Sequence, residues 1–348
     1  MRTKGRGPAT AAGKPCPSVF PLVVAPRASR YLLSMPEGHT IHRAARDHHA
    51  ALAGRALAVT SPQGRADFAA LAGGAERVTL RRVEAYGKHL FYVFERGRTV
   101  HVHLGLFGKF RRSLSPPPPP AATVRMRLEG PEVTIDLRGP TACEVITRGE
   151  KAALLARLGP DPLRDDADPQ AFFDYLGRSK VPIGAALMDQ SVIAGVGNVY
   201  RAEVLHLLRL HPLVAARAVP RAVAEEMWTL LGLLLRKGVE DGRIITTRGL
   251  VAARGGRVTR GESVHVYGRR TCFTCGGPVQ RFLLRARTVH LCTGCQPDAT
   301  ATLSVRAKMA TTTSLSEMSA TSTSEYPTPD AILGPGDHYS ALPAPARR

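Results

Sequence analysis

The chain has 348 residues, a formal net charge of +20 and a pI near 10.5. This length can hold two or three domains with real hydrophobic cores. No apolar stretch approaches the roughly 18 residues that a membrane-spanning helix needs, so we expect a soluble protein without a membrane partner. The 48 Lys and Arg residues outnumber the 28 Asp and Glu residues, which favours a polyanionic partner such as a nucleic acid.

The two ends of the chain differ in composition from the middle. Residues 1–34 contain six basic residues and no acidic residue, and they lack sustained apolar periodicity. We interpret them as a non-native or disordered extension, for which three explanations stay open: a start codon placed too far upstream, a transit-type presequence, or a genuine basic arm. Ser, Thr, Ala and Pro dominate residues 297–348. We predict a disordered tail there, because too little apolar surface is available to offset the entropy of ordering.

The segment after Met35 predicts one helix followed by strands. Apolar residues recur at helical spacing up to about residue 54, so a helix is expected to begin at or just after Pro36. Period-two alternation follows in four stretches, at residues 90–94, 100–104, 124–128 and 133–137. Turn residues separate these stretches, which predicts a β-sandwich or barrel with a leading helix over residues 35–155.

Beyond residue 159 the pattern becomes helical. Apolar residues at helical spacing occur at residues 185–187, 199–210 and 222–235. We therefore predict a helical domain over residues 156–262 and a small module over residues 263–296. The expected fold class is α+β and multidomain, with an N-terminal β-sandwich, a helical domain and a C-terminal zinc-finger β-hairpin.

The cysteines predict a metal site. Two Cys-x2-Cys pairs contain four of the six cysteines, namely Cys272, Cys275, Cys292 and Cys295. This spacing is typical of a tetrathiolate site for one Zn²⁺ ion, which would be structural because no coordination position stays open. The remaining Cys16 and Cys143 are isolated, which fits a reducing compartment better than a disulfide framework.

Residues 35–38 (Met-Pro-Glu-Gly) predict a catalytic pair. If translation begins at Met35 and this methionine is removed, Pro36 has a free secondary amine next to the carboxylate of Glu37. Such an amine is a candidate nucleophile, and Glu37 is a candidate proton donor next to it. An internal Pro36 has an amide nitrogen and cannot attack. The structural alternative is that Pro36 only begins a helix and that Glu37 favours its dipole.

Several motifs occur in the order seen in formamidopyrimidine-DNA glycosylase and endonuclease VIII. They are residues 35–38, 87–90, 103–108, 158–163, 188–190 and 195–200, followed by the cysteine quartet. The chain resembles this family over about residues 35–296, and its start is most similar to actinobacterial endonuclease VIII. The resemblance implies a helix-two-turn-helix domain and a bifunctional DNA glycosylase/AP lyase of base excision repair, which acts through an N-terminal proline Schiff base and β,δ-elimination.

The same resemblance implies the partner and the setting. The expected partner is damaged double-stranded DNA, with single-stranded and bubble DNA left open as further substrates. A monomer in the bacterial cytoplasm, associated with the nucleoid through DNA binding, is expected.

Individual residues also receive roles from the resemblance. Lys88, in a turn before a strand, is implied to contact phosphate near the lesion and to assist the sugar chemistry. The structural alternative is a solvated lysine in a hairpin. Asn198 opens an apparent helix after two glycines, and the resemblance implies that it binds phosphate. The glycines would let backbone amides approach an anion at the positive end of that helix. Arg287 matches the family's phosphate-clamping arginine, with Arg285 as the fallback candidate.

Leu106 and Phe107 lie in a turn flanked by glycines, where large apolar residues are not expected in a core. The family places void-filling side chains there. An inserted apolar wedge would stabilise the gap that a damaged nucleotide leaves when it swings out. Leu106 is the better candidate, and core packing of Phe107 is an equal alternative.

Departures from the family pattern bear on the substrate. Thr40 stands where a second glutamate is usual and His39 replaces a customary proline, which puts any role of a second carboxylate in doubt. The Arg-Arg-Phe-Gly wedge of the formamidopyrimidine branch is absent from the comparable residues 136–140, and the loop 249–263 lacks a purine-capping sequence. These features favour oxidised pyrimidines, with an oxidised-purine glycosylase as the alternative.

Two other classes of protein also stay open. One is a non-catalytic, zinc-dependent damaged-DNA-binding protein that retains residues 1–34. The other is a basic RNA-binding scaffold, which gives no reason for residues 35–37.

Overall fold

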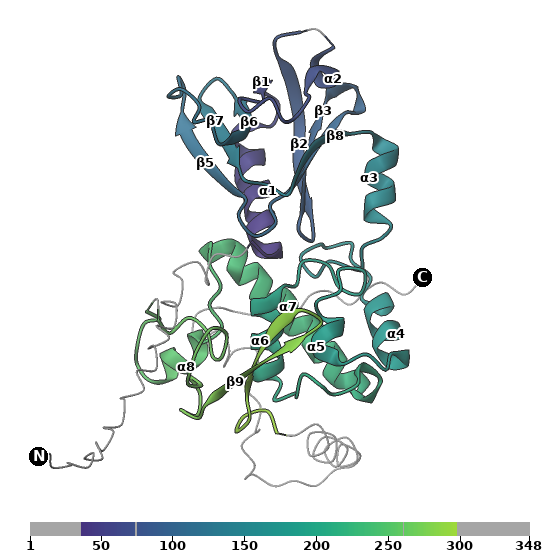
Figure 1. Cartoon of the computed structure of the whole chain (residues 1–348), viewed down its shortest axis with the longest axis vertical. Helices are drawn as coiled ribbons and strands as arrows, with labels where there is room; N and C mark the ends of the chain where they lie inside the picture. The colour runs from purple at the N-terminus through teal and green to yellow at the C-terminus, as the bar shows by residue number, and fades with distance from the viewer. Residues whose placement is uncertain (1–35, 74, 260, 298–348) are drawn as a thin grey trace, which may run out of the picture. The chain divides into compact units, whose positions relative to one another are not determined.

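The structure is a computed structural model that describes residues 36–73, 75–259 and 261–297 (Figure 1). The predictions for residues 1–34 and for the tail from residue 298 lie outside this part of the chain. The described residues all fall within one compact unit. The residue bounds that we gave for the individual domains stay a prediction.

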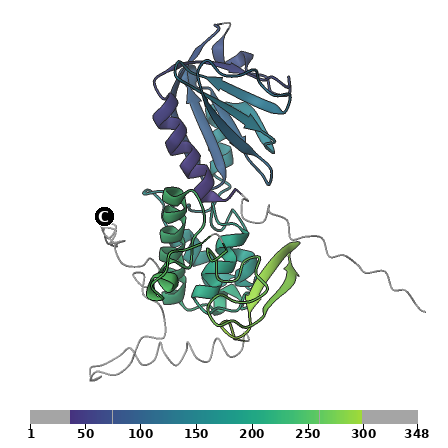
Figure 2. The same cartoon turned by 90° about the vertical axis from the view of Figure 1, so that its left-hand side faces the viewer.

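The leading helix α1 (Gly38–Leu52) begins two residues after Pro36, as predicted. Its buried side carries Ile41, Ala45 and Leu52 at helical spacing. Figure 2 shows α1 lying along one side of the strands. Pro36 and Glu37 directly precede α1, so the helix holds them at the end of the sandwich where α1 begins.

The strands form the predicted antiparallel sandwich. Their bounds are β1 Ala56–Thr60, β2 Val78–Tyr86, β3 His89–Phe94, β4 Thr99–His103, β5 Lys109–Leu114, β6 Val124–Glu129, β7 Val133–Arg138 and β8 Ala142–Ile146. The hydrogen-bonded order is β5-β7-β6-β1-β2-β3-β4-β8. The first part of β1 pairs with β2 and its second part with β6, so β1 joins the two layers. A short helix α2 (Ala69–Ala72) and a 3-10 turn (Glu95–Gly97) complete this part.

The four predicted strands are present as β3, β4, β6 and β7, and the prediction missed the other four. β2 has an irregular register between Leu80 and Arg82, which interrupts its alternation. β5 lies at the edge of the sheet and exposes charged side chains along most of its length. The irregular register of β2 and the exposed charged residues of β5 each break the period-two alternation of apolar residues by which a strand is predicted.

The sandwich core consists of side chains from both layers and from α1. Leu90, Tyr92 and Phe94 of β3 are fully buried, as their alternation predicts. The Tyr92 hydroxyl lies 2.7 Å from Nδ1 of buried His48 on α1, so the polar end of this core tyrosine has a partner.

The helical part follows residue 147. Its elements are α3 Arg148–Leu155, α4 Gln170–Arg178, α5 Ile183–Ala186, α6 Asn198–Leu207, a 3-10 turn Ala216–Ala218, α7 Arg221–Asp241 and α8 Arg248–Ala253. α6 ends earlier than predicted, because Arg209 has a left-handed φ of 51°. The prediction that residues 249–263 form a loop is also partly wrong, since α8 occupies the first of these residues.

The C-terminal module contains the predicted hairpin. Strands β9 (Val279–Leu284) and β10 (Arg287–Cys292) pair in antiparallel register. Arg285 and Ala286 form the turn with φ values of 47° and 60°. Two such residues are typical of a tight turn that matches the strand twist. The turn is thereby held beside Arg287.

Candidate active site and nucleic-acid interface

A cavity of about 580 Å³ gathers most of the predicted site residues. Its lining includes Pro36 and Glu37 before α1, Lys88 from the β2–β3 turn, Leu106 from the β4–β5 turn, Asn198 from α6, and Arg285 and Arg287 from the hairpin. These residues come from segments that are far apart in the sequence. The fold therefore brings together a carboxylate, a lysine and several DNA-binding candidates around one space.

The Glu37 carboxylate lies at the N-terminus of α6. It accepts hydrogen bonds from the backbone amides of Gly197 (3.1 Å), Val199 (2.9 Å) and Tyr200 (3.4 Å). A Cβ atom at Gly197 would lie 2.3 Å from the Glu37 carboxyl carbon, so this approach requires glycine. We expected these amides to approach a phosphate. In the structure, the group that they hold is the Glu37 carboxyl group.

Burial raises the pKa of Glu37, although Lys88 and the three amides act in the opposite direction. The side chain is only 2% exposed. A carboxyl group with a raised pKa stays protonated at higher pH than an ordinary glutamate, and it can then donate its proton. Glu37 therefore has the environment of a general acid.

Lys88 lies in the two-residue turn between β2 and β3, after Gly87 with a φ of 56°. The lysine is half-buried and faces the cavity, which disfavours the alternative of a solvated hairpin lysine. Burial lowers the pKa of Lys88, Glu37 opposes this shift, and Arg287 adds to it. Each of Glu37 and Lys88 thus stabilises the charged form of the other.

Asn198 connects α6 to the hairpin. Its side-chain amide donates to the Thr288 carbonyl oxygen at 3.1 Å, and its carbonyl oxygen accepts a hydrogen bond from the Arg201 guanidinium. Arg201 also donates to the Thr288 carbonyl at 2.8 Å. This network places Asn198 next to the first residues of β10, where Arg287 is exposed beside the cavity.

Arg201 and His103 also line the cavity, although no role was predicted for either of them from the sequence. Arg201 is 1% exposed, and burial lowers its pKa to about 10. In the sequence, Arg201 is recognisable as a basic residue among the apolar residues of α6. His103 belongs to the 103–108 motif and packs against His89, with 5.0 Å between the ring centroids.

Leu106 and Phe107 are 51% and 79% exposed in the β4–β5 turn. The alternative of core packing for Phe107 is therefore wrong. Leu106 lines the cavity, whereas Phe107 does not belong to its lining. The turn requires Gly105, whose φ is 64° and whose Cβ would lie 1.9 Å from the Thr141 hydroxyl oxygen.

The positions that depart from the family pattern have structural roles here. Thr40 Oγ1 lies 3.2 Å from Nε2 of His39. Burial lowers the pKa of His39 to about 4, so this ring is neutral at physiological pH. Asp136, where the comparable wedge region begins, forms a buried ion pair with Arg127, with 2.7 Å between Arg127 Nε and an Asp136 carboxylate oxygen.

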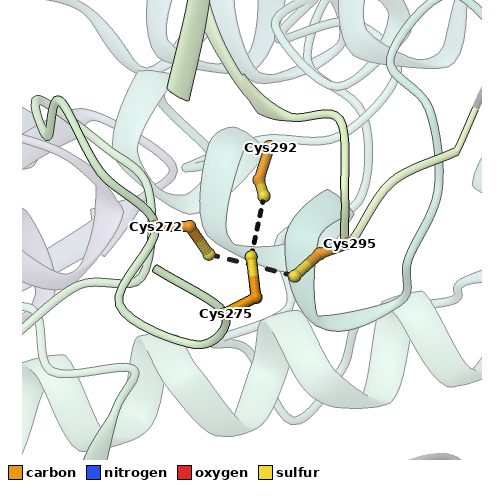
Figure 3. Close-up of side chains that lie close together, drawn as sticks. All are labelled: Cys272, Cys275, Cys292 and Cys295. Atoms are coloured by element: carbon orange, nitrogen blue, oxygen red, sulfur yellow. Dashed lines mark hydrogen bonds between the residues drawn. The ribbon is translucent and has the colours of Figure 1, made fainter. Parts of the chain in front are cut away.

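The four cysteines of the C-terminal module converge (Figure 3). Their sulfur atoms all lie within 4.8 Å of one another, with 3.9 Å between Cys272 and Cys295 and 3.5 Å between Cys275 and Cys292. Tetrahedral thiolates at the usual Zn–S distance lie about 3.8 Å apart. The cluster can therefore hold one metal ion.

A buried carboxylate attaches this module to α6. Glu203 is fully buried and accepts hydrogen bonds from the backbone amides of His265 (2.7 Å), Val266 (3.0 Å) and Tyr267 (2.9 Å). The Thr246 hydroxyl donates a further bond at 2.5 Å. These contacts hold the start of the cysteine module against the helix whose N-terminus binds Glu37.

Comparison with known proteins identifies the family. Residues 35–143 match the formamidopyrimidine-DNA glycosylase N-terminal domain, and residues 158–249 match the formamidopyrimidine-DNA glycosylase H2TH domain. Endonuclease 8 1 of Mycobacterium tuberculosis is 45% identical over 273 residues, which cover 75% of this chain and 100% of that protein. The chain belongs to the formamidopyrimidine-DNA glycosylase family. Its members are DNA glycosylases with AP lyase activity, and the prediction of the family and of an enzyme is confirmed.

Other relatives agree with this assignment. The formamidopyrimidine-DNA glycosylase of Thermus thermophilus is 34% identical over 233 residues, covering 64% of this chain and 85% of that protein. The solved structure of Lactococcus lactis formamidopyrimidine-DNA glycosylase, non-covalently bound to DNA with an AP site, has a TM-score of 0.62 at 21% identity. It covers 75% of this chain and 100% of that one, which confirms the fold class. Within the described ranges, no helix is long and apolar enough to cross a membrane.

Proposed function

We propose that this DNA glycosylase excises oxidised bases from duplex DNA, prefers oxidised pyrimidines, and cuts the backbone through a Schiff base at Pro36. The observation that carries the proposal is the Glu37 carboxyl group, buried with a raised pKa in the cavity that Pro36 and Lys88 also line. A nucleophile, a proton donor and a cation around one cavity have the roles that base excision requires.

The reaction follows from these groups. The free Pro36 amine attacks the sugar C1′, the C1′–N bond to the base breaks, and the proton of the amine leaves with the base. Glu37 then donates a proton to O4′ as the C1′–O4′ bond breaks and the sugar ring opens. The product is an iminium between Pro36 and C1′, which is cationic because proline is a secondary amine. Its charge acidifies the C2′ proton, so removal of this proton expels the 3′ phosphate. A second elimination then releases the 5′ phosphate.

This chemistry requires Pro36 at the N-terminus of the mature protein. The match to the family's N-terminal domain begins at residue 35, directly before Pro36. We propose that translation begins at Met35 and that this methionine is then removed. Pro36 lies just before the N-terminus of α1, whose positive end disfavours a protonated amine. More of the amine is then free to attack near neutral pH.

DNA binding is assigned to the rim of the same cavity. Lys88, Asn198 and Arg287 would contact phosphates near the lesion, since each of them lines the cavity. Leu106, and Phe107 next to it, would fill the gap left by the extruded nucleotide. Their exposure in a turn supports this role.

The preference for pyrimidines rests on the residues around the site. Thr40 has no carboxylate, and Asp136 forms a buried ion pair with Arg127. The test compares single-turnover excision of dihydrouracil, thymine glycol and 8-oxoguanine from matched duplexes. Faster excision of the two pyrimidines supports the proposal, whereas a clear preference for 8-oxoguanine opposite cytosine assigns the chain to the oxidised-purine alternative.

We further propose that the cysteine cluster holds one structural Zn²⁺ ion. Cys272, Cys275, Cys292 and Cys295 would supply all four ligands, which leaves no position for a catalytic water. The metal would fix the hairpin that carries Arg287. For the whole enzyme we propose a monomer that acts on DNA in the bacterial cytoplasm.

A further inference from the structure

Three glycines from different segments meet beside the cavity. The Gly38 amide donates to the Gly195 carbonyl oxygen at 2.8 Å, and a Cβ atom at Gly38 would lie 2.9 Å from Gly195 Cα. A Cβ atom at Gly87 would lie 3.1 Å from the Gly195 amide nitrogen. Gly38 and Gly87 directly adjoin Glu37 and Lys88 in the sequence, and Gly195 shortly precedes α6. The catalytic segments therefore touch backbone to backbone.

Asp161 is the side chain at this junction. It is fully buried, and one carboxylate oxygen accepts hydrogen bonds from the Gly87 amide at 2.7 Å and from His42 Nε2 at 2.8 Å. The other oxygen accepts the Leu163 amide at 2.9 Å. Asp161 thus connects the Lys88 turn, helix α1 and the loop before α4. A Cβ atom at Gly195 would lie 3.7 Å from the same carboxylate.

We propose that Asp161, supported by His42, is a positioning residue that fixes Lys88 relative to Glu37. This inference rests on the proposed function, because it concerns the geometry of that catalytic pair. Lys88 directly follows Gly87, so the bond between the Gly87 amide and Asp161 sets where the lysine side chain begins. Glu37 is fixed from the other side through Gly38 and the α6 amides.

Only a carboxylate satisfies this site. Three donors converge on one buried side chain, and an ionised carboxylate offers acceptors alone. Asparagine has the same shape, but its NH₂ group would face at least one of the three donors. If the asparagine oxygen keeps the position toward Gly87 and His42, the NH₂ group of Asp161→Asn faces the Leu163 amide, and this unpaired buried donor shifts the side chain. The neutral oxygen is also a weaker acceptor than a carboxylate, so the Gly87 amide and the Lys88 turn are held less firmly. Displacement by about 1 Å is enough to slow a positioned reaction strongly.

The test uses the active enzyme and the Asp161→Asn variant. The matched control is Asp174→Asn, which removes the same charge from an exposed position on α4. We expect single-turnover excision to slow roughly tenfold in Asp161→Asn, while the dissociation constant for lesion DNA stays close to that of the control. Excision at the rate of the control would overturn the inference. An inactive wild-type enzyme would instead count against the proposed function.

A double-mutant cycle with Lys88→Met separates positioning from general damage to the fold. If Asp161 acts through Lys88, Asp161→Asn should slow the Lys88→Met enzyme much less than it slows the wild type. Equal slowing in both backgrounds would contradict positioning through Lys88. The midpoint of thermal unfolding is measured for each variant, so that the rates are compared among folded proteins.

His42 provides a second test that leaves Asp161 intact. His42→Gln retains an N–H donor toward the carboxylate, whereas His42→Leu removes it. We expect excision by His42→Gln to stay near the wild-type rate and excision by His42→Leu to fall in the direction of Asp161→Asn. Equal excision rates in the two His42 variants would show that His42 does not contribute to the positioning of Lys88.

Discussion

The Glu37 carboxylate accepts a hydrogen bond at 2.9 Å from the backbone amide of Val199, which lies 162 positions further along the chain. Gly197, the N-cap residue of α6, has no side chain to satisfy the first amides of this helix. Glu37 takes that place from another segment. The candidate general acid and the helix that begins with Asn198 are therefore one structural unit.

Glu37→Gln should abolish proton donation while it preserves much of the local structure. The amide oxygen can still accept hydrogen bonds from Gly197 and Tyr200, although the NH₂ group then faces the Val199 amide. Glu37 has no proposed contact with phosphate, so binding of lesion DNA should change little. Base excision should slow by about 100-fold or more, because a positioned proton donor is lost. Single-turnover excision and equilibrium binding are measured in parallel, with the exposed Glu225→Gln on α7 as the control. A loss of binding as large as the loss of turnover would indicate a structural role instead.

The pH dependence of excision should report the Glu37–Lys88 pair. Burial raises the pKa of Glu37, so the rate should fall as the pH rises through this value and the proton is lost. The positive charge of Lys88 opposes this shift. Its removal in Lys88→Met should therefore move the alkaline limb of the single-turnover rate to higher pH. A limb that moves to lower pH would contradict the assignment of Glu37 as the acid.

Arg287→Ala should weaken binding to DNA of any sequence, because the proposed contact is to phosphate. The slope of the logarithm of the binding constant against the logarithm of the salt concentration should decrease by about one contact. Asn198→Ala, which removes a neutral donor, should weaken binding with a smaller change in slope. Arg178→Ala at the end of α4 is the control. An unchanged slope in Arg287→Ala would place this arginine away from the DNA.

Removal of the metal should reproduce the loss of Arg287 without unfolding the sandwich. Chelation, or Cys292→Ser, takes away the constraint on β10, and the hairpin that carries Arg287 should lose its fixed position. We expect one zinc per chain by elemental analysis before chelation. The β-sheet circular dichroism signal should persist while DNA affinity falls. Full affinity in metal-free protein would show that the cluster does not support binding.

Much of the site could be predicted from local sequence. The Pro36-Glu37 pair, the cysteine quartet and the turn that exposes Leu106 each leave a pattern within a few residues, and the segment before Cys292 indicates a hairpin. The spacing of residues along the sequence could not predict that Pro36, Glu37 and Leu106 line one cavity. This arrangement depends on close backbone approaches, such as that between Gly38 and Gly195, which only the tertiary fold brings about.

Other features left weaker signals or none. Asp161 belongs to the 158–163 motif, but its partners Gly87 and His42 lie more than seventy positions away, as their sequence separations show. The α6 amides looked free for a phosphate because the sequence does not show that Glu37 occupies them. Strand β5 escaped prediction because an edge strand can expose charged side chains on both faces.

The central claim, that Pro36 is the nucleophile, is tested most directly by borohydride trapping on DNA with an abasic site. Protein that begins at Pro36 should form a stable covalent adduct, and mass spectrometry of its peptides should locate the DNA sugar on the Pro36 nitrogen. Protein that retains residues 1–34 should form no adduct, because its Pro36 nitrogen is an amide. Trapping at the same rate by the extended protein, or a sugar attached to Lys88, would contradict the account.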